Sequence, residues 1–214
     1  MNKRERNTIN FTGRFIWAVI IFYQFSTLQI LFAQSTAEEL LKNIQDKFNS
    51  IDNLSADIIH SINGNVNLKG NVYFKKENSM RLELKNNLII SDGMTSWNYN
   101  QKDNKVIITD YDSEGNKILS IRQLLFEYPK ECELSAIESE GKKVLQLIPK
   151  TDTFSFNSVK LFLNDDYLIT KVLVDDPAAG NIRIDLSNYK LNTNLPDNYF
   201  SFSPPEGCQV IDLR

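Results

Sequence analysis

The sequence predicts a mainly β protein in which about ten antiparallel strands form one sheet, accompanied by two helices. Short segments in which apolar and polar residues alternate recur along the chain, for example SMRLELK at 79–85. Clusters of Gly, Asn, Asp and Pro separate these segments, as expected for strands joined by hairpin turns. Only two segments place apolar residues at helical spacing. One face of such a sheet is apolar, and other parts of the fold must cover it.

The composition argues against several classes of function. The chain of 214 residues carries 24 Lys and Arg against 27 Asp and Glu, so it lacks the positive excess of a nucleic-acid-binding surface. It contains one histidine, no H-E-x-x-H motif and no G-x-S-x-G motif. We therefore expect no nucleic-acid partner, no enzyme, and no metal or other cofactor.

Residues 1–33 have the features of a cleaved export signal. Four basic residues precede an apolar run at 15–32, and the small residue Ala33 stands at the expected cleavage point. The alternative is a membrane anchor, which needs about 20 apolar residues, whereas the longest uninterrupted piece is 15–23. No cysteine follows the cleavage point directly, so we expect no lipid anchor. Residues 34–214 contain no linker and are expected to form a single domain.

The first predicted helix covers residues 36–49. Thr36 and Glu39 have the spacing of a capping box at its start. One apolar stripe follows at helical spacing: Ala37, Leu40, Leu41, Ile44, Phe48 and Ile51. The intervening polar residues, Lys47 among them, are expected on the opposite side. The stripe fits ordinary core packing and a lid over the sheet equally well.

Two strands are expected at 54–62 and 66–76, joined by a turn at 63–65 with the sequence NGN. The only histidine, His60, lies in the first strand. Because no further ligand stands at metal-binding spacing, we expect neither a metal nor a catalytic role for it.

The chain then continues as a meander up to residue 99. Apolar and charged residues alternate at 80–85, and a run of apolar residues at 88–90 ends in a turn at 91–93, where a glycine can take a positive φ. Trp97 and Tyr99 are two apart and therefore share one face of the next strand.

The second helix is expected to begin after a cap at Ser120 and to end at Pro129, because proline interrupts a helix. Its apolar residues are Ile118, Ile121, Leu124, Leu125 and Tyr128. It can act as a second cover over the sheet or fill one end of the core, and periodicity does not distinguish the two.

Further strands are expected at 105–110, 132–138, 144–149, 158–164, 167–175 and 181–189. A loop at 192–198 precedes Phe200 and Phe202. The two cysteines, Cys132 and Cys208, have no diagnostic spacing, so we favour two buried thiols over a disulfide, although an oxidising compartment would permit pairing.

The apolar residues of the central meander are candidates to line a hollow on the covered face of the sheet. They are Val72, Phe74, Met80, Leu82, Leu84, Ile90, Trp97 and Tyr99. The same residues at the same spacing would also form the ordinary core of a sandwich or a closed barrel.

Three motifs in this chain resemble the LolA family of outer-membrane lipoprotein carriers. They are GNVYFKK at 70–76, ISDG at 90–93 followed by WNY at 97–99, and FSFSPPEG at 200–207. The resemblance implies an incomplete antiparallel β-barrel covered by a helical lid, with a hydrophobic cavity that accepts the acyl chains of lipoproteins. The eight candidate residues would then line that cavity.

The resemblance also implies a cellular location and binding partners. The protein would be a periplasmic monomer that receives acylated lipoproteins from an inner-membrane ABC-type complex and passes them to an outer-membrane acceptor. The alternative within the same fold is a lipid-sensing regulatory protein of the envelope without carrier activity. Such regulators carry a second domain, for which residues 34–214 leave little room.

The chain departs from the family pattern at one position. LolA proteins commonly have Arg followed by Pro where this chain has Lys76 and Glu77, and that Arg is thought to hold the lid closed. Lysine lacks the planar, five-donor fork of arginine. Lys76 is therefore a candidate for a weaker lid latch, and an ion pair with Glu77 is the simpler alternative.

Overall fold

The computed structural model describes residues 36–76, 79–111 and 121–214. In this part of the chain, twelve strands form one sheet with the order β12-β6-β5-β4-β3-β2-β1-β11-β10-β9-β8-β7. The strands are β1 (Asn53–Ile62), β2 (Asn65–Lys75), β3 (Ser79–Leu84), β4 (Asn87–Asp92), β5 (Thr95–Asn100), β6 (Lys105–Asp110), β7 (Cys132–Ser139), β8 (Lys142–Pro149), β9 (Ser158–Leu163), β10 (Ile169–Asp176), β11 (Gly180–Leu191) and β12 (Gln209–Asp212).

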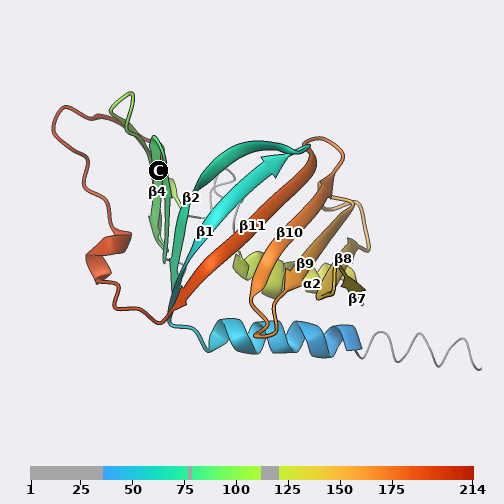
Figure 1. Cartoon of the computed structure of the whole chain (residues 1–214). Helices are drawn as coiled ribbons and strands as arrows, with labels where there is room; N and C mark the ends of the chain where they lie inside the picture. Colours follow the sequence, from blue (N-terminus) through green and yellow to red (C-terminus); the bar gives the residue numbers. More distant parts are fainter. Residues whose placement is uncertain (1–35, 77–78, 112–120) are drawn as a thin grey trace, which may run out of the picture.

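The sheet is strongly curved and open, because its edge strands β7 and β12 do not pair with each other (Figure 1). Among the described strands, all neighbours are antiparallel except β12 and β6, which are parallel. The predicted class, a curved sheet forming an incomplete barrel under a helical cover, is confirmed. The strands number twelve rather than about ten.

Local sequence explains the hairpins. At the turn between β4 and β5, Gly93 has a φ of 93°, which a residue with a side chain rarely adopts. The Asp92 carboxylate accepts hydrogen bonds from the backbone N–H groups of Met94 and Thr95 at 2.9 and 2.8 Å. The turn predicted at 91–93 is therefore present, and the side chain of Asp92 stabilises it.

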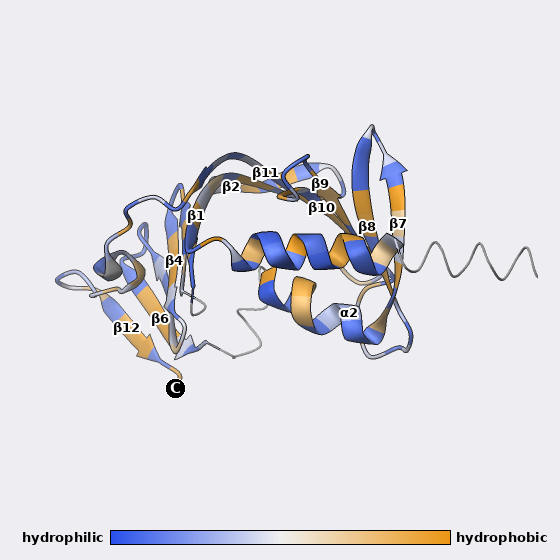
Figure 2. Ribbon diagram, turned by 90° about the horizontal axis from the view of Figure 1, so that it is seen from below, coloured by the Kyte–Doolittle hydropathy of each residue, from blue (hydrophilic) through white to orange (hydrophobic). Residues whose placement is uncertain are grey.

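Two helical segments cover the concave side of the sheet, which we call the inner face (Figures 1 and 2). The first is helical at 36–49. The second combines a π-helical turn, η2 (Gln123–Glu127), with α2 (Tyr128–Glu131). The two are joined where the Gln45 amide donates to the Leu125 carbonyl at 2.7 Å and where the rings of Phe48 and Phe126 lie 6.0 Å apart.

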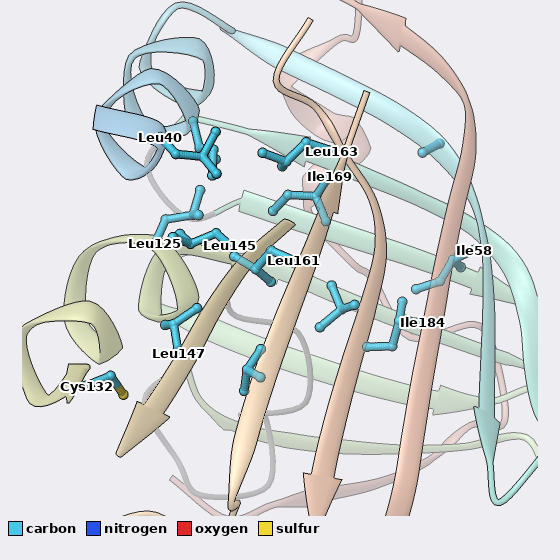
Figure 3. Packing of buried hydrophobic residues seen from close by; sticks show 14 of the residues in the cluster. Leu40, Ile58, Leu125, Cys132, Leu145, Leu147, Leu161, Leu163, Ile169 and Ile184 are labelled. Carbon is cyan, nitrogen blue, oxygen red and sulfur yellow. The ribbon is translucent and has the colours of Figure 1, made fainter. Parts of the chain in front are cut away.

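The apolar stripe of the first helix is buried as predicted, since Ala37, Leu40 and Ile44 belong to the core. Figure 3 shows Leu40 from this helix and Leu125 from η2 among side chains of the sheet. The core therefore lies between the inner face and the two helices.

The predicted end of the second helix at Pro129 is wrong. Pro129 is buried and lies in the first turn of α2, and the helix continues to Glu131. Proline is tolerated there because its missing N–H and fixed φ suit the first turn of an α-helix, and the preceding turn has the wider π-helical register. The predicted cap at Ser120 lies outside the described residues.

The C-terminal segment follows the opposite, convex side of the sheet, which we call the outer face (Figure 1). It contains the 3-10 turn η3 (Asp197–Phe200) and then β12. Strand β12 was not predicted. It pairs in parallel with β6, with Val210 opposite Val106.

The predicted signal peptide at 1–33 lies outside the described residues, whereas Thr36, the predicted cap of the first helix, is itself helical. None of the helices described is long and apolar enough to cross a bilayer. Both cysteines are free, with Cys132 in the core and Cys208 partly exposed. The preference for thiols over a disulfide agrees with this arrangement, but of the two only Cys132 is buried as expected.

Candidate functional site

An apolar cavity lies between the first helix and the inner face of the sheet. Its wall consists of Ile44, Lys47, Phe48, Ile51, Leu54, Ala56, Val72, Phe74, Ile121, Leu125, Tyr167, Leu168, Ile169, Leu186 and Tyr189. The space between these side chains, together with the solvent at its opening, amounts to 440 Å³, and little of it is wide enough for a water molecule. The cavity is therefore a narrow apolar slot under a closed cover.

Three neighbouring strands build the floor of this cavity. Register places Ala56 of β1 opposite Val72 of β2, and Leu54 opposite Phe74, so these four side chains share the inner face. From β11, Tyr189 completes the floor, and its hydroxyl donates to the Ile169 carbonyl. Burial raises the pKa of Tyr189 well above the ordinary value of 10.0. The Tyr189 hydroxyl thus stays neutral at physiological pH.

A turn between β9 and β10 closes one end of the cavity. Tyr167 has a φ of 60°, and the Asn164 side-chain oxygen accepts from the backbone N–H groups of Asp166 and Leu168 at 3.1 and 2.8 Å. This fixed turn places Tyr167 and Leu168 in the wall. Leu125 of η2 lies in the wall as well, so the cavity draws on segments from most of the chain.

Five of the eight residues predicted to line the hollow lie on the inner face. Val72 pairs with Leu82, Phe74 with Met80, and Gly70 with Leu84, so their side chains point to the same side. Val72 and Phe74 line the cavity itself. Leu82 belongs to the core, and Leu84 packs against it.

The other three, Ile90, Trp97 and Tyr99, lie on the outer face and are not brought together with those five. Leu82 of β3 pairs with Ile89, which puts the next residue, Ile90, on the opposite side. Trp97 pairs with Ile90 and therefore faces the same way. The run at 88–90 is apolar at every position, so its sequence did not reveal which residue points inward.

The C-terminal segment covers this outer face. The guanidinium carbon of Arg81 lies 4.4 Å from the centre of the Tyr199 ring, and the Tyr199 hydroxyl donates to the Glu83 carboxylate at 3.1 Å. Burial is the main cause that raises the pKa of Tyr199 above 10.0, and hydrogen bonding adds to it. Further along, the rings of Tyr99 and Phe202 lie 5.1 Å apart. The FSFSPPEG motif therefore packs against the outside of the sheet.

Lys76 directly follows β2 and contacts the linker between the first helix and β1. Its ammonium pairs with the Asp52 carboxylate, and its backbone N–H donates to the Asp52 carbonyl at 3.0 Å. Asp52 belongs to the linker between the helix and β1, and its own N–H donates to Asn192 Oδ1 at 2.8 Å. The partner of Lys76 is thus the linker, and the alternative partner, Glu77, lies outside the described residues.

His60 is half-buried on β1, and burial lowers its pKa below 6.5. In the described ranges, no group of three His, Cys, Asp or Glu residues is placed to hold a metal ion. The two cysteines also take no part in the cavity wall.

Lys47 is the cavity residue that sequence reasoning placed on the wrong side of the first helix. It is half-buried and lines the cavity. It follows Ile44 by three positions and precedes Ile51 by four, so helical spacing alone puts it at the edge of the apolar stripe. Its charge led to its assignment to the polar side.

Comparison with known proteins adds the family relationship. The sequence model described as "Outer membrane lipoprotein carrier protein LolA" matches residues 60–203. An uncharacterized protein of Methanocaldococcus jannaschii is 26% identical over 189 residues, which cover 83% of this chain and 54% of that protein. An outer-membrane lipoprotein carrier protein of Methylibium petroleiphilum is 28% identical over 126 residues, which cover 58% of this chain and 61% of the relative. The matches thus span little more than half the length of these relatives.

Among solved structures, the crystal structure of an uncharacterized conserved protein from Thermus thermophilus is similar, with a TM-score of 0.57. The match covers 83% of this chain and 99% of that chain at 16% sequence identity. At this identity the likeness concerns the fold.

Proposed function

This chain belongs to the LolA family, and from that premise we propose that it is a periplasmic carrier which binds the acyl chains of lipoproteins in the cavity under its first helix. The observation that carries the proposal is the slot between Phe48 of the helix and Leu186 of the sheet, whose wall is apolar apart from one lysine and two tyrosines. An acyl chain is the ligand that such a wall accommodates without unpaired polar groups.

Burial of acyl chains supplies enough free energy for transport through water. Each buried CH₂ contributes about 0.8 kcal/mol, so a chain that buries about ten of them gains roughly 8 kcal/mol before the costs of association. Because the slot is narrow in the closed form, the first helix must move away from the sheet before cargo enters. No chemical step on the cargo is needed.

The proposed transport route follows from this binding of acyl chains. The protein, as a monomer, takes acylated lipoproteins from an inner-membrane ABC-type complex and releases them to an outer-membrane acceptor. Release requires a surface at least as apolar as the cavity, since otherwise transfer of the chains is unfavourable.

A polar substitution in the cavity wall tests the proposal. Leu186 of β11 is partly buried and lines the cavity. We expect Leu186→Gln to weaken binding of a synthetic acylated lipopeptide about tenfold, because an amide buried without a partner costs about 1–3 kcal/mol. The measurement is isothermal titration of the purified protein with the lipopeptide.

The matched control is Leu173→Gln. Leu173 is also partly buried, but it lies on the outer face of β10, where it pairs with Arg183. This variant should lower the melting temperature by a similar amount and keep wild-type affinity. Equal loss of affinity in both variants, or no binding by the wild-type protein, would contradict the proposal.

A further inference from the structure

Among the described residues that line the apolar cavity, Lys47 is the one that carries a charge. It stands in the last turn of the first helix and is half-buried. A lysine in this situation lays its alkyl stem along apolar neighbours and keeps its ammonium toward water. The positive charge therefore belongs at the mouth of the slot, next to the place where the polar head of a bound amphiphile must remain.

The acidic residues nearest to Lys47 in sequence are already paired elsewhere. Asp46 pairs with Lys42, and Asp52 pairs with Lys76. The helical neighbours of Lys47 three and four positions away are uncharged: Asn43, Ile44, Ser50 and Ile51. Within the described residues, no carboxylate forms an ion pair with Lys47. Among these residues, no carboxylate therefore competes with a ligand for the Lys47 ammonium.

We propose that the cavity takes a single-chain anionic amphiphile of the fatty-acid type, with its chain in the slot and its head group paired with Lys47. This inference rests on the proposed acyl-chain cavity and specifies the head group that the cavity prefers. Because the closed slot is narrow, the first helix must move before any chain enters, and one unbranched chain needs the smallest such movement. The apolar wall holds the chain, and Lys47 selects the charge at its end.

A pair of ligands that differ only in the head group tests this. Decanoate and 1-decanol have the same chain length, and at a pH well above the carboxyl pKa only the first is charged. By isothermal titration, wild-type protein should bind decanoate about two- to fivefold more tightly than 1-decanol, as expected for a partly exposed ion pair. Lys47→Met keeps the length of the alkyl stem and should bind the two ligands with equal affinity.

Lys42→Met is the matched control, because Lys42 lies on the same helix, is exposed and is absent from the cavity wall. It should keep the preference for decanoate. Two results would contradict the inference: equal binding of both ligands by wild-type protein, or a Lys47→Met variant that keeps the preference and only has a lower melting temperature. Lys47 would then stabilise the end of the helix without selecting the head group, while the proposed acyl-chain cavity would stand. If wild-type protein binds neither ligand, both the inference and the acyl-chain cavity fail.

Discussion

At the scale of single residues, the close approach of two strands decides where side chains are allowed. Gly70 of β2 faces Leu84 of β3, and a Cβ atom added at Gly70 would overlap the Glu83 carbonyl oxygen. The backbone would have to move, since a carbonyl group in a paired strand cannot rotate away as a flexible side chain can. A glycine at this position is therefore required by packing within the sheet, beside the floor of the cavity.

We accordingly expect Gly70→Ala to lower the free energy of unfolding by about 2 kcal/mol, the scale of an overpacked interior site. Urea denaturation measures this as a lower midpoint with an unchanged slope. Gly141→Asn is the control, because Gly141 has a φ of +67° and nothing within 4 Å of an added Cβ, and asparagine tolerates that backbone region. A wild-type midpoint for Gly70→Ala would mean that the strands can separate there at no cost.

At the scale of elements, the sheet has a second apolar cluster on its outer face. Ile90, Val106 and Phe200 are almost fully buried there, with exposures of 0%, 0% and 2%, although they belong to neither the cavity nor the main core. The turn η3 lies against β3 and β4. The C-terminal segment therefore covers the outer face of β3 and β4, while the inner face of these strands packs against the main core.

Phe200→Ala should detach this segment at a cost of about 3 kcal/mol, the lower end for Phe→Ala in a core. Limited proteolysis should then cut the chain after β11, while affinity for acyl ligands stays at the wild-type level because the cavity is on the other face. Phe202→Ala, at a partly exposed position, should have a smaller effect. Loss of ligand affinity in Phe200→Ala would instead show that the two faces are coupled.

At the scale of the whole molecule, two polar contacts add to the apolar packing that holds the first helix in the closed position. Gln45 connects it to η2 through a partly buried hydrogen bond of 2.7 Å. The ion pair of Lys76 with Asp52 is exposed, with side-chain exposures of 54% and 71%, and it reaches only the linker. Exposed ion pairs contribute little to stability, about 0–1 kcal/mol. We infer that the helix-to-helix contact restrains opening more than Lys76 does.

Gln45→Ala should therefore tighten apparent binding of acyl ligands about fivefold, because loss of one net hydrogen bond of about 1 kcal/mol raises the population of the open form. Lys76→Leu should change affinity by less than about twofold. Titration with the same lipopeptide measures both. The reverse order of effects would restore Lys76 as the latch that the family resemblance implies.

The sequence by itself determined the strands apart from β12, most of their hairpins and the buried stripe of the first helix. These features depend on local periodicity and on turn residues such as Gly93, which act within a few positions of the chain. The motifs at 70–76, 90–99 and 200–207 also identified the family. A sheet with an apolar face covered by two helices was therefore predictable, and so was the presence of Val72 and Phe74 on that face.

Only the tertiary structure decided which face each apolar residue occupies and which distant segments meet. Ile89 and Ile90 are equally apolar, and the pairing of Ile89 with Leu82 sends Ile90 to the outer face. The parallel pairing of β12 with β6 and the contact of Lys76 with Asp52 join positions far apart in the chain. The place of Lys47 in the cavity wall likewise depends on how the helix is rotated over the sheet. Such contacts depend on global register and packing, which local periodicity does not encode.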